Sequence, residues 1–112
     1  MAKRKQDDPT VTASSGNVFA DLGLPHGEVE MLKISVAIAI SKTIQKRGLT
    51  QAQAAKIVGT DQAKMSALMR GVLKGFTVER LMGFLVRLGR DIEIKIGSAK
   101  DTAGKIKIRS AA

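Results

Sequence analysis

The stretch from Thr50 to Gly71, TQAQAAKIVGTDQAKMSALMRG, constrains the fold of this chain more than any other. Thr50 and Gln53 have the spacing of a capping box, in which each side chain accepts a hydrogen bond from the backbone of the other residue. Gly59 favours the left-handed backbone that ends a helix. Asp61 is suited to cap a second helix, which Gly71 would end. The stretch therefore predicts two short helices joined by a tight turn.

The second of these helices is predicted to have a buried face and a polar face. Met65, Leu68 and Met69 recur at helical spacing and indicate the buried face. Ala55, in the first helix, is small where the two helices must approach closely. Thr60 departs from the pattern, because an apolar residue is more usual after the glycine. The arrangement is that of a DNA-binding helix-turn-helix, whose second helix enters the major groove.

The charge of the chain favours a polyanionic partner. Its 112 residues include 19 Lys and Arg against 10 Asp and Glu, a formal net charge of +9, and this balance suits nucleic acid. The only aromatic residues are 3 Phe, which argues against a single-strand binder that stacks bases on rings. The length suits one small domain with a modest core.

Composition excludes most catalytic and metal chemistry. The chain has no cysteine, so it can form neither a disulfide nor a thiolate metal site. Its one histidine, His26, lies in a Leu-Pro-His-Gly stretch with no obvious catalytic partner, and is interpreted as a surface residue. The most apolar run, residues 29–40, is interrupted by charges and is short of the roughly 20 residues that span a bilayer. We expect a cytoplasmic, non-enzymatic protein with no cofactor and no membrane contact.

The rest of the chain divides into three parts. Residues 1–16 mix charges with Pro, Ser, Thr and Gly, and predict a disordered basic arm. Residues 17–90 are predicted to form the helical domain, which begins with a short apolar segment around Phe19. Besides the two short helices, this domain should contain a long helix over residues 27–46 and another over residues 78–88.

Helical spacing also predicts the core. On the long helix, one stripe of apolar residues is expected to be buried in the core. A second apolar group lies off that stripe and is expected to be covered by the N-terminal segment or by a second protein; it consists of Met31, Ile34 and Ile38. Leu81, Phe84, Leu85 and Leu88 define the core face of the last helix. The predicted stripe on the long helix consists of Val29, Leu32, Val36, Ala39, Ile40, Thr43 and Ile44.

The sequence period changes after residue 90. Residues 91–96, DIEIKI, alternate strictly and predict a strand with Ile92, Ile94 and Ile96 on one face. Residues 105–109, KIKIR, alternate again, so the segment 91–112 is predicted to be a strand or a hairpin; a flexible tail beyond Ile96 is the alternative. Because an isolated hairpin is barely stable, we expect this segment to dimerise through its isoleucines.

Four stretches together carry a resemblance to a known family. NVFADLGLP, KRGLTQAQAAKIVG, the second short helix and GFTVERLMGFLVRLGRDIEI resemble the XRE (Cro/repressor-like) family, and within it the HigA-type antitoxins of bacterial toxin–antitoxin pairs. The resemblance implies a mainly α, lambda-repressor-like domain that forms a homodimer. It also implies binding to a double-stranded DNA operator, repression of its own operon and a partner toxin of the RelE/HigB type.

The resemblance also implies roles for single residues. Gln51 matches a position that contacts phosphate, and Gln62 matches a position that contacts bases. Chemistry agrees, since Gln pairs bidentately with adenine and Arg with guanine, whereas Lys acts as a point charge for phosphate. The predicted DNA-binding residues are Gln51, Asp61, Gln62, Ala63, Lys64, Ser66, Ala67, Arg70 and Lys74.

Two other functions fit the same sequence. One is a stand-alone or phage-type XRE regulator with no toxin, which the absence of a neighbouring reading frame for a small toxin would favour. The other is a protein–protein adaptor whose helix-turn-helix is only structural. Loss of DNA binding at physiological salt would favour the adaptor.

Overall fold

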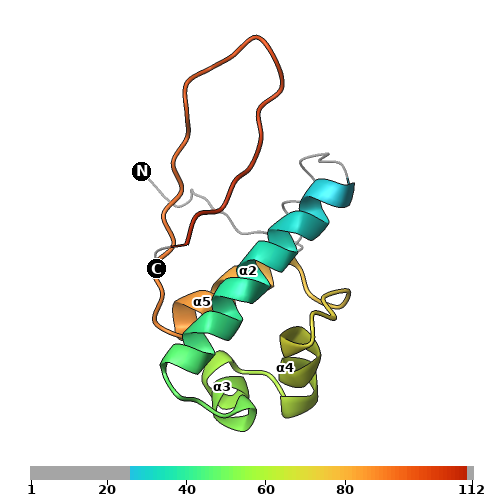
Figure 1. The fold of residues 1–112 in the computed structure, drawn as a ribbon, viewed down its shortest axis with the longest axis vertical. Coiled ribbons are helices and arrows are strands. Elements are labelled where there is room, and N and C mark those ends of the chain that lie inside the picture. The colour runs from blue at the N-terminus through green and yellow to red at the C-terminus, as the bar shows by residue number, and fades with distance from the viewer. Residues whose placement is uncertain (1–25, 111–112) are drawn as a thin grey trace, which may run out of the picture.

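The longest helix among the described residues, α2 (His26–Lys46), packs chiefly against the last helix of the chain. Our computed structural model describes residues 26–110, so the predicted arm (1–16) and the apolar segment around Phe19 lie outside the described residues. Three helices follow, α3 (Gln51–Val58), α4 (Gln62–Met69) and α5 (Val78–Arg87). In Figure 1, α5 lies alongside α2, while α3 and α4 lie together at the end of the bundle. These bounds agree with the predicted ones to within about two residues.

The core lies between α2 and α5 and is closed at one end by α3 and α4. Ile40, Met65 and Leu81, one residue from each of three helices, have no exposed surface. On α2 the predicted stripe is confirmed except at Val29, which is only half-buried. Ala37 is buried although it lies off that stripe. Packing against α4 as well as α5 therefore widens the buried face of α2 beyond one stripe.

The single polar residue among the buried side chains of α2 is fully hydrogen-bonded. The Thr43 hydroxyl donates to the Ala39 carbonyl at 2.7 Å and accepts from an Arg90 guanidinium nitrogen at 3.0 Å. Arg47 donates to the Leu88 carbonyl at 3.2 Å. Because buried polar groups are costly unless paired, these contacts favour one relative position of α2 and the end of α5. They also hold the point from which the C-terminal segment leaves the helices.

The predicted C-terminal strand or hairpin is not found in the structure. None of residues 26–110 forms a strand, and residues 91–110 run out beyond the helices and return as two extended legs (Figure 1). Ile94 is 77% exposed and Ile96 is 90% exposed. The prediction failed because alternation specifies which face is apolar, whereas a strand also needs a neighbour for its N–H and C=O groups. The two legs do not supply that neighbour to each other.

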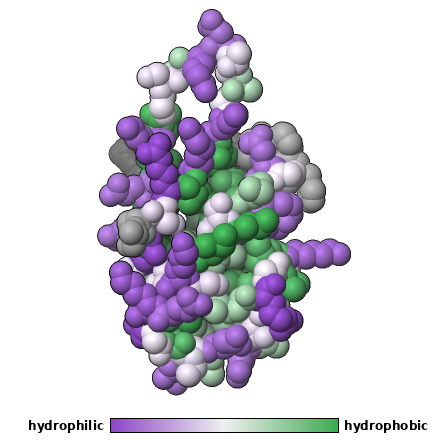
Figure 2. All heavy atoms as spheres, in the orientation of Figure 1, coloured by the Kyte–Doolittle hydropathy of each residue, from purple (hydrophilic) through white to green (hydrophobic). Residues whose placement is uncertain are grey.

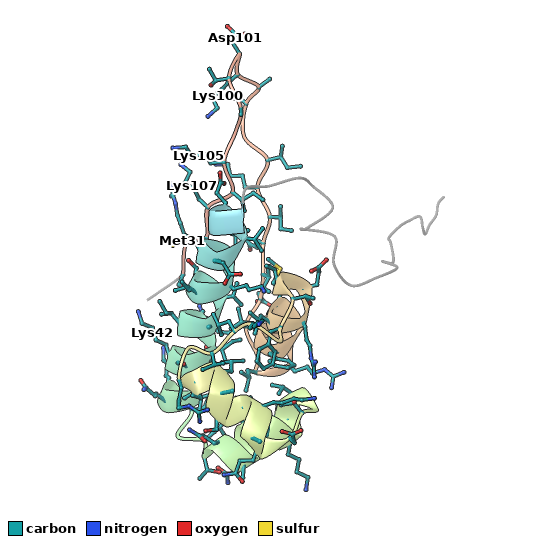
Figure 3. The ribbon with its side chains drawn as sticks, turned by 90° about the vertical axis from the view of Figure 1, so that its right-hand side faces the viewer. Met31, Lys42, Lys100, Asp101, Lys105 and Lys107 are labelled. Carbon is teal, nitrogen blue, oxygen red and sulfur yellow. The ribbon has the colours of Figure 1, made fainter. Side chains whose placement is uncertain are left out.

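A second apolar surface lies along α2. Met31, Ile34 and Ile38, which were predicted to lie off the core stripe, are exposed, and Figure 2 shows apolar surface along the middle of the face that α2 crosses. Met31 and Lys42 lie on the side of α2 that faces away from α5 (Figure 3). None of the helices in residues 26–110 combines the length and the apolar character that crossing a membrane requires.

Candidate nucleic-acid interface

The first helix of the motif, α3, begins with the predicted capping box. The Gln53 N–H donates to the Thr50 hydroxyl at 3.0 Å, and the Thr50 N–H donates to the Gln53 side-chain oxygen at 2.9 Å. Two of the backbone donors that a helix start leaves unpaired are thereby satisfied. Both bonds join residues three apart in the sequence, so the start of α3 is determined locally.

The turn between α3 and α4 depends on a glycine. Gly59 has φ +83°, and its N–H and that of Thr60 both donate to the Ala55 carbonyl at 2.9 Å. A side chain at Gly59 would meet Arg87 Nη1 at 3.2 Å and would also strain the backbone. The Thr60 hydroxyl is buried and finds no hydrogen-bond partner among the described residues. The apolar residue that is more usual at this position would avoid that cost.

The second helix, α4, is held at both ends. Asp61 accepts a hydrogen bond from the Lys64 N–H at 2.8 Å and so caps the first turn. At the other end Gly71 has φ +84°, and the Val72 N–H donates to the Ala67 carbonyl at 2.9 Å. Asp61, which was predicted to contact DNA, thus has a structural role in capping α4.

The two sides of α4 differ sharply in exposure. Met65 and Leu68 are buried, with 0% and 1% of their surface exposed, and attach the helix to the core. Gln62, Lys64 and Arg70 are exposed on the other side. Of the remaining residues predicted to bind DNA, Ala63 is exposed, whereas Ser66 and Ala67 are half-buried. The predicted core face of α4 is confirmed at Met65 and Leu68, whereas Met69, predicted on the same face, is only half-buried.

One of the outer side chains has an intrahelical partner. Arg70 Nη1 donates to the Ser66 hydroxyl at 2.7 Å, four residues earlier on the same helix face. This bond directs the guanidinium back along α4 and leaves its other N–H groups for an acceptor outside the chain. Ser66 therefore positions Arg70, a relation that the sequence analysis did not include.

The surface beside α4 has both polar and positively charged residues. Gln51 is half-buried at the first position of α3, and Lys74 is exposed in the loop that follows α4. Between residues 42 and 80 the sequence has eight Lys and Arg against two Asp and Glu, so this region carries +6 of the net charge. A basic region around a protruding helix suits a polyanionic surface.

Arg80 is a further cation near α4 that was not among the residues predicted to bind DNA. Its guanidinium lies 5.7 Å from the centre of the Phe76 ring and 5.6 Å from that of Phe84, and these rings meet edge to face at 6.0 Å. Phe84 lies four residues after Arg80 on α5, so that contact was readable from helical spacing, whereas Phe76 lies in the loop before α5. Arg80 is an exposed cation just beyond the Lys74 loop.

The described residues bring together no constellation suited to metal binding. Residues 26–110 contain no group of three His, Cys, Asp or Glu side chains that could hold a metal ion. The candidate functional site in this part of the chain is therefore the exposed face of α4 together with the basic residues around it.

Comparisons with known proteins agree with this geometry. A family model described as a helix-turn-helix domain matches residues 18–97. A solved structure named "Putative XRE Family Transcriptional Regulator" is similar with a TM-score of 0.72 and 38% sequence identity, over 78% of this chain and 100% of that chain. The search of curated proteins finds no match. The matched range includes all four helices and residues 91–96, and it ends before residues 105–109.

Proposed function

This chain belongs to the XRE-type helix-turn-helix family, and we propose that it is a sequence-specific DNA-binding repressor of transcription. The observation that carries the proposal is the construction of α4, which is capped at both ends, attached to the core by Met65 and Leu68 and polar on its outer face. A helix with its side chains is about 10–12 Å across, which fits a major groove about 12 Å wide.

Within this interface we assign base readout first to Gln62. It is the first residue of α4 and is exposed, and the N-terminal residues of a recognition helix are those that reach base edges. A glutamine amide can donate to and accept from adenine N7 and N6 together. Ala63 offers no hydrogen bond but suits contact with a thymine methyl group.

We assign phosphate contacts to the cations and to Gln51. Lys64 and Lys74 are exposed and carry flexible point charges, which suit phosphate better than a base edge. Arg70, held along α4 by its bond to Ser66, has the geometry to contact a phosphate beside the groove. Asp61 caps α4 and would repel phosphate, so its contribution to binding is to hold Gln62 and Lys64 in place.

Repression requires more affinity than one recognition helix provides. We propose a homodimer formed through residues 91–96, because Ile94 and Ile96 are almost fully exposed in the single chain. A symmetric dimer presents two recognition helices to half-sites about one helical turn, roughly 34 Å, apart. Binding such an operator would exclude other proteins from the same DNA.

The resemblance to HigA-type antitoxins supports a narrower proposal, that this regulator also binds a small RelE/HigB-like toxin. One feature of the structure suits a protein partner, namely the exposed apolar residues Met31, Ile34 and Ile38 on α2. Co-purification with a toxin encoded beside this gene would support the antitoxin role. If no toxin gene lies beside this gene, the chain would instead be a stand-alone regulator.

Selection of binding sites from a pool of random duplexes tests the proposed function. We expect an enriched motif with two half-sites related by two-fold symmetry. Recovery of no motif at physiological salt would contradict sequence-specific binding and favour the adaptor. Recovery of a single half-site would contradict the dimer and leave DNA binding intact.

A further inference from the structure

The segment 91–96 has two faces of different chemistry. Its isoleucines lie on one face of an extended chain, and Asp91, Glu93 and Lys95 lie on the other. A space of 440 Å³ is enclosed by the two C-terminal legs and by helix residues that include Val36 and Met82. The segment therefore borders apolar helix residues across this space, while Ile94 and Ile96 stay largely exposed and its backbone edges have no ladder.

The charge order of this segment makes it complementary to itself in one antiparallel register. If two copies pair about Ile94, each Glu93 lies opposite the partner's Lys95, and each Ile92 lies opposite the partner's Ile96. Centring the pair on Glu93 would oppose two glutamates, and centring it on Lys95 would oppose two lysines. A shift by one residue would place isoleucines opposite charges and on the wrong face.

We propose that two copies of this chain pair antiparallel through residues 91–96, with the two-fold axis at Ile94 and a Glu93–Lys95 ion pair on each side of it. This inference rests on the proposed homodimer and specifies its geometry. Pairing satisfies the N–H and C=O groups of one edge of each segment. It also places the partner's isoleucines beside Ile92, Ile94 and Ile96, which makes one continuous apolar face.

A hairpin within one chain is the competing arrangement of the same segment. The register that opposes Ile92 to Ile108 and Ile94 to Ile106 opposes Lys95 to Lys105, a like-charge pair, although it also pairs Asp91 with Arg109 and Glu93 with Lys107. In the structure the legs enclose the 440 Å³ space and form no ladder. Figure 3 shows Lys105 and Lys107 along the returning leg, and Lys100 and Asp101 at the tip of the loop. The returning leg also lies outside the matched family range, whereas residues 91–96 lie inside it.

Cysteine cross-linking tests the register directly, because the chain has no cysteine of its own. In the full-length protein, Ile94→Cys places the two cysteines directly opposite each other. Their Cα atoms would then be about 4.5–5.5 Å apart, which is within the range that a disulfide spans. The matched control Ile96→Cys removes an isoleucine from the same face but sets the two thiols four residues apart, about 14 Å. We expect a covalent dimer from Ile94→Cys under mild oxidation and none from Ile96→Cys.

Sedimentation of the unmodified protein separates the register from the dimer itself. A monomer at micromolar concentration would overturn both the proposed homodimer and this inference. A dimer with no cross-link at position 94, or with an equal cross-link at position 96, would overturn the register alone. Both cysteine variants are sedimented under reducing conditions as well, so that a missing cross-link is not confused with loss of the dimer.

Charge reversal provides a second test that leaves the isoleucines in place. Glu93→Lys and Lys95→Glu each create two like-charge contacts across the axis, and each should weaken dimerisation about tenfold. The double variant exchanges the two charges and should restore the dimer. In the hairpin, Lys95→Glu would instead gain a favourable contact with Lys105. A double variant as weak as Glu93→Lys would overturn the proposed register.

Discussion

The helix pair α3–α4 and the C-terminal segment 91–110 satisfy their backbone hydrogen bonds in different ways. In the helix pair, Thr50, Gln53 and Asp61 complete the ends of helices whose other bonds are internal. The C-terminal segment has an equally regular sequence but forms no ladder in one chain. A helix is complete within its own residues, whereas a strand requires a second segment.

The two regions also differ in how firmly they are attached to the core. Side chains of α4 reach the core through Met65 and Leu68, so its outer face is held in one orientation. Ile94 and Ile96 are exposed on a segment that extends past the helices. We infer that the first region is built to present side chains to DNA and the second to bring two copies together.

Removing the C-terminal segment should give the largest effect. Every buried residue within the described range 26–110 precedes Gly89, so a chain ending at Arg90 should remain helical by circular dichroism. It should sediment as a monomer and bind operator roughly 10²–10⁴-fold more weakly, because the second recognition helix is no longer tethered. A chain ending at Ser98 keeps residues 91–96 and should remain a dimer. If the Arg90 truncation stays dimeric, the exposed face of α2 becomes the candidate contact.

Truncating one apolar side chain in each region measures how much that region contributes to folding and to dimerisation. Met65→Ala removes a fully buried side chain and should lower the free energy of unfolding by roughly 2–5 kcal/mol. Ile96→Ala should change it by less than about 0.5 kcal/mol in the monomer and weaken dimerisation instead. Urea unfolding at protein concentrations below and above the dimer dissociation constant measures both. Equal losses in the dilute monomer would show that residues 91–96 belong to the core.

Variants on the outer face of α4 separate stability from recognition. Gln62→Ala should leave unfolding unchanged and cost roughly 1–3 kcal/mol of binding at one base pair per half-site. Lys64→Ala should weaken all duplexes alike and reduce the salt dependence of binding. Titrations against cognate and random duplexes at several salt concentrations distinguish them. Equal losses on cognate and random DNA from Gln62→Ala would contradict its assignment to base readout.

The smallest expected effect compares two threonines of the motif. Thr60→Val removes a buried hydroxyl that has no partner among the described residues, and should stabilise the fold by about 1 kcal/mol. Thr50→Val makes the same chemical change at a hydroxyl that caps α3, and should destabilise it by about 1 kcal/mol. Thermal unfolding of both variants gives the signs. A loss of stability in Thr60→Val would indicate that its hydroxyl is hydrogen-bonded in solution.

Much of the candidate interface was predictable because its determinants are close in sequence. The caps of α3 and α4 join residues three apart, and the buried pair Met65 and Leu68 follows helical spacing. The contact of Arg80 with Phe84 could have been read from the same spacing, whereas its contact with Phe76 depends on the loop before α5. The bond between Ser66 and Arg70 is also local, but rotamers and solvent compete for a long exposed side chain, so spacing alone does not predict it.

Local signals define where the helices of this protein begin and end, because those signals are hydrogen bonds and glycine conformations within a few residues. Long-range packing, by contrast, buries Ala37, leaves Val29 half-buried and pairs Thr43 with Arg90, 47 residues away. It also leaves residues 91–96 extended and unpaired in one chain. Alternation gives a segment two faces, but ladder hydrogen bonds come from another segment, whose position no local pattern specifies.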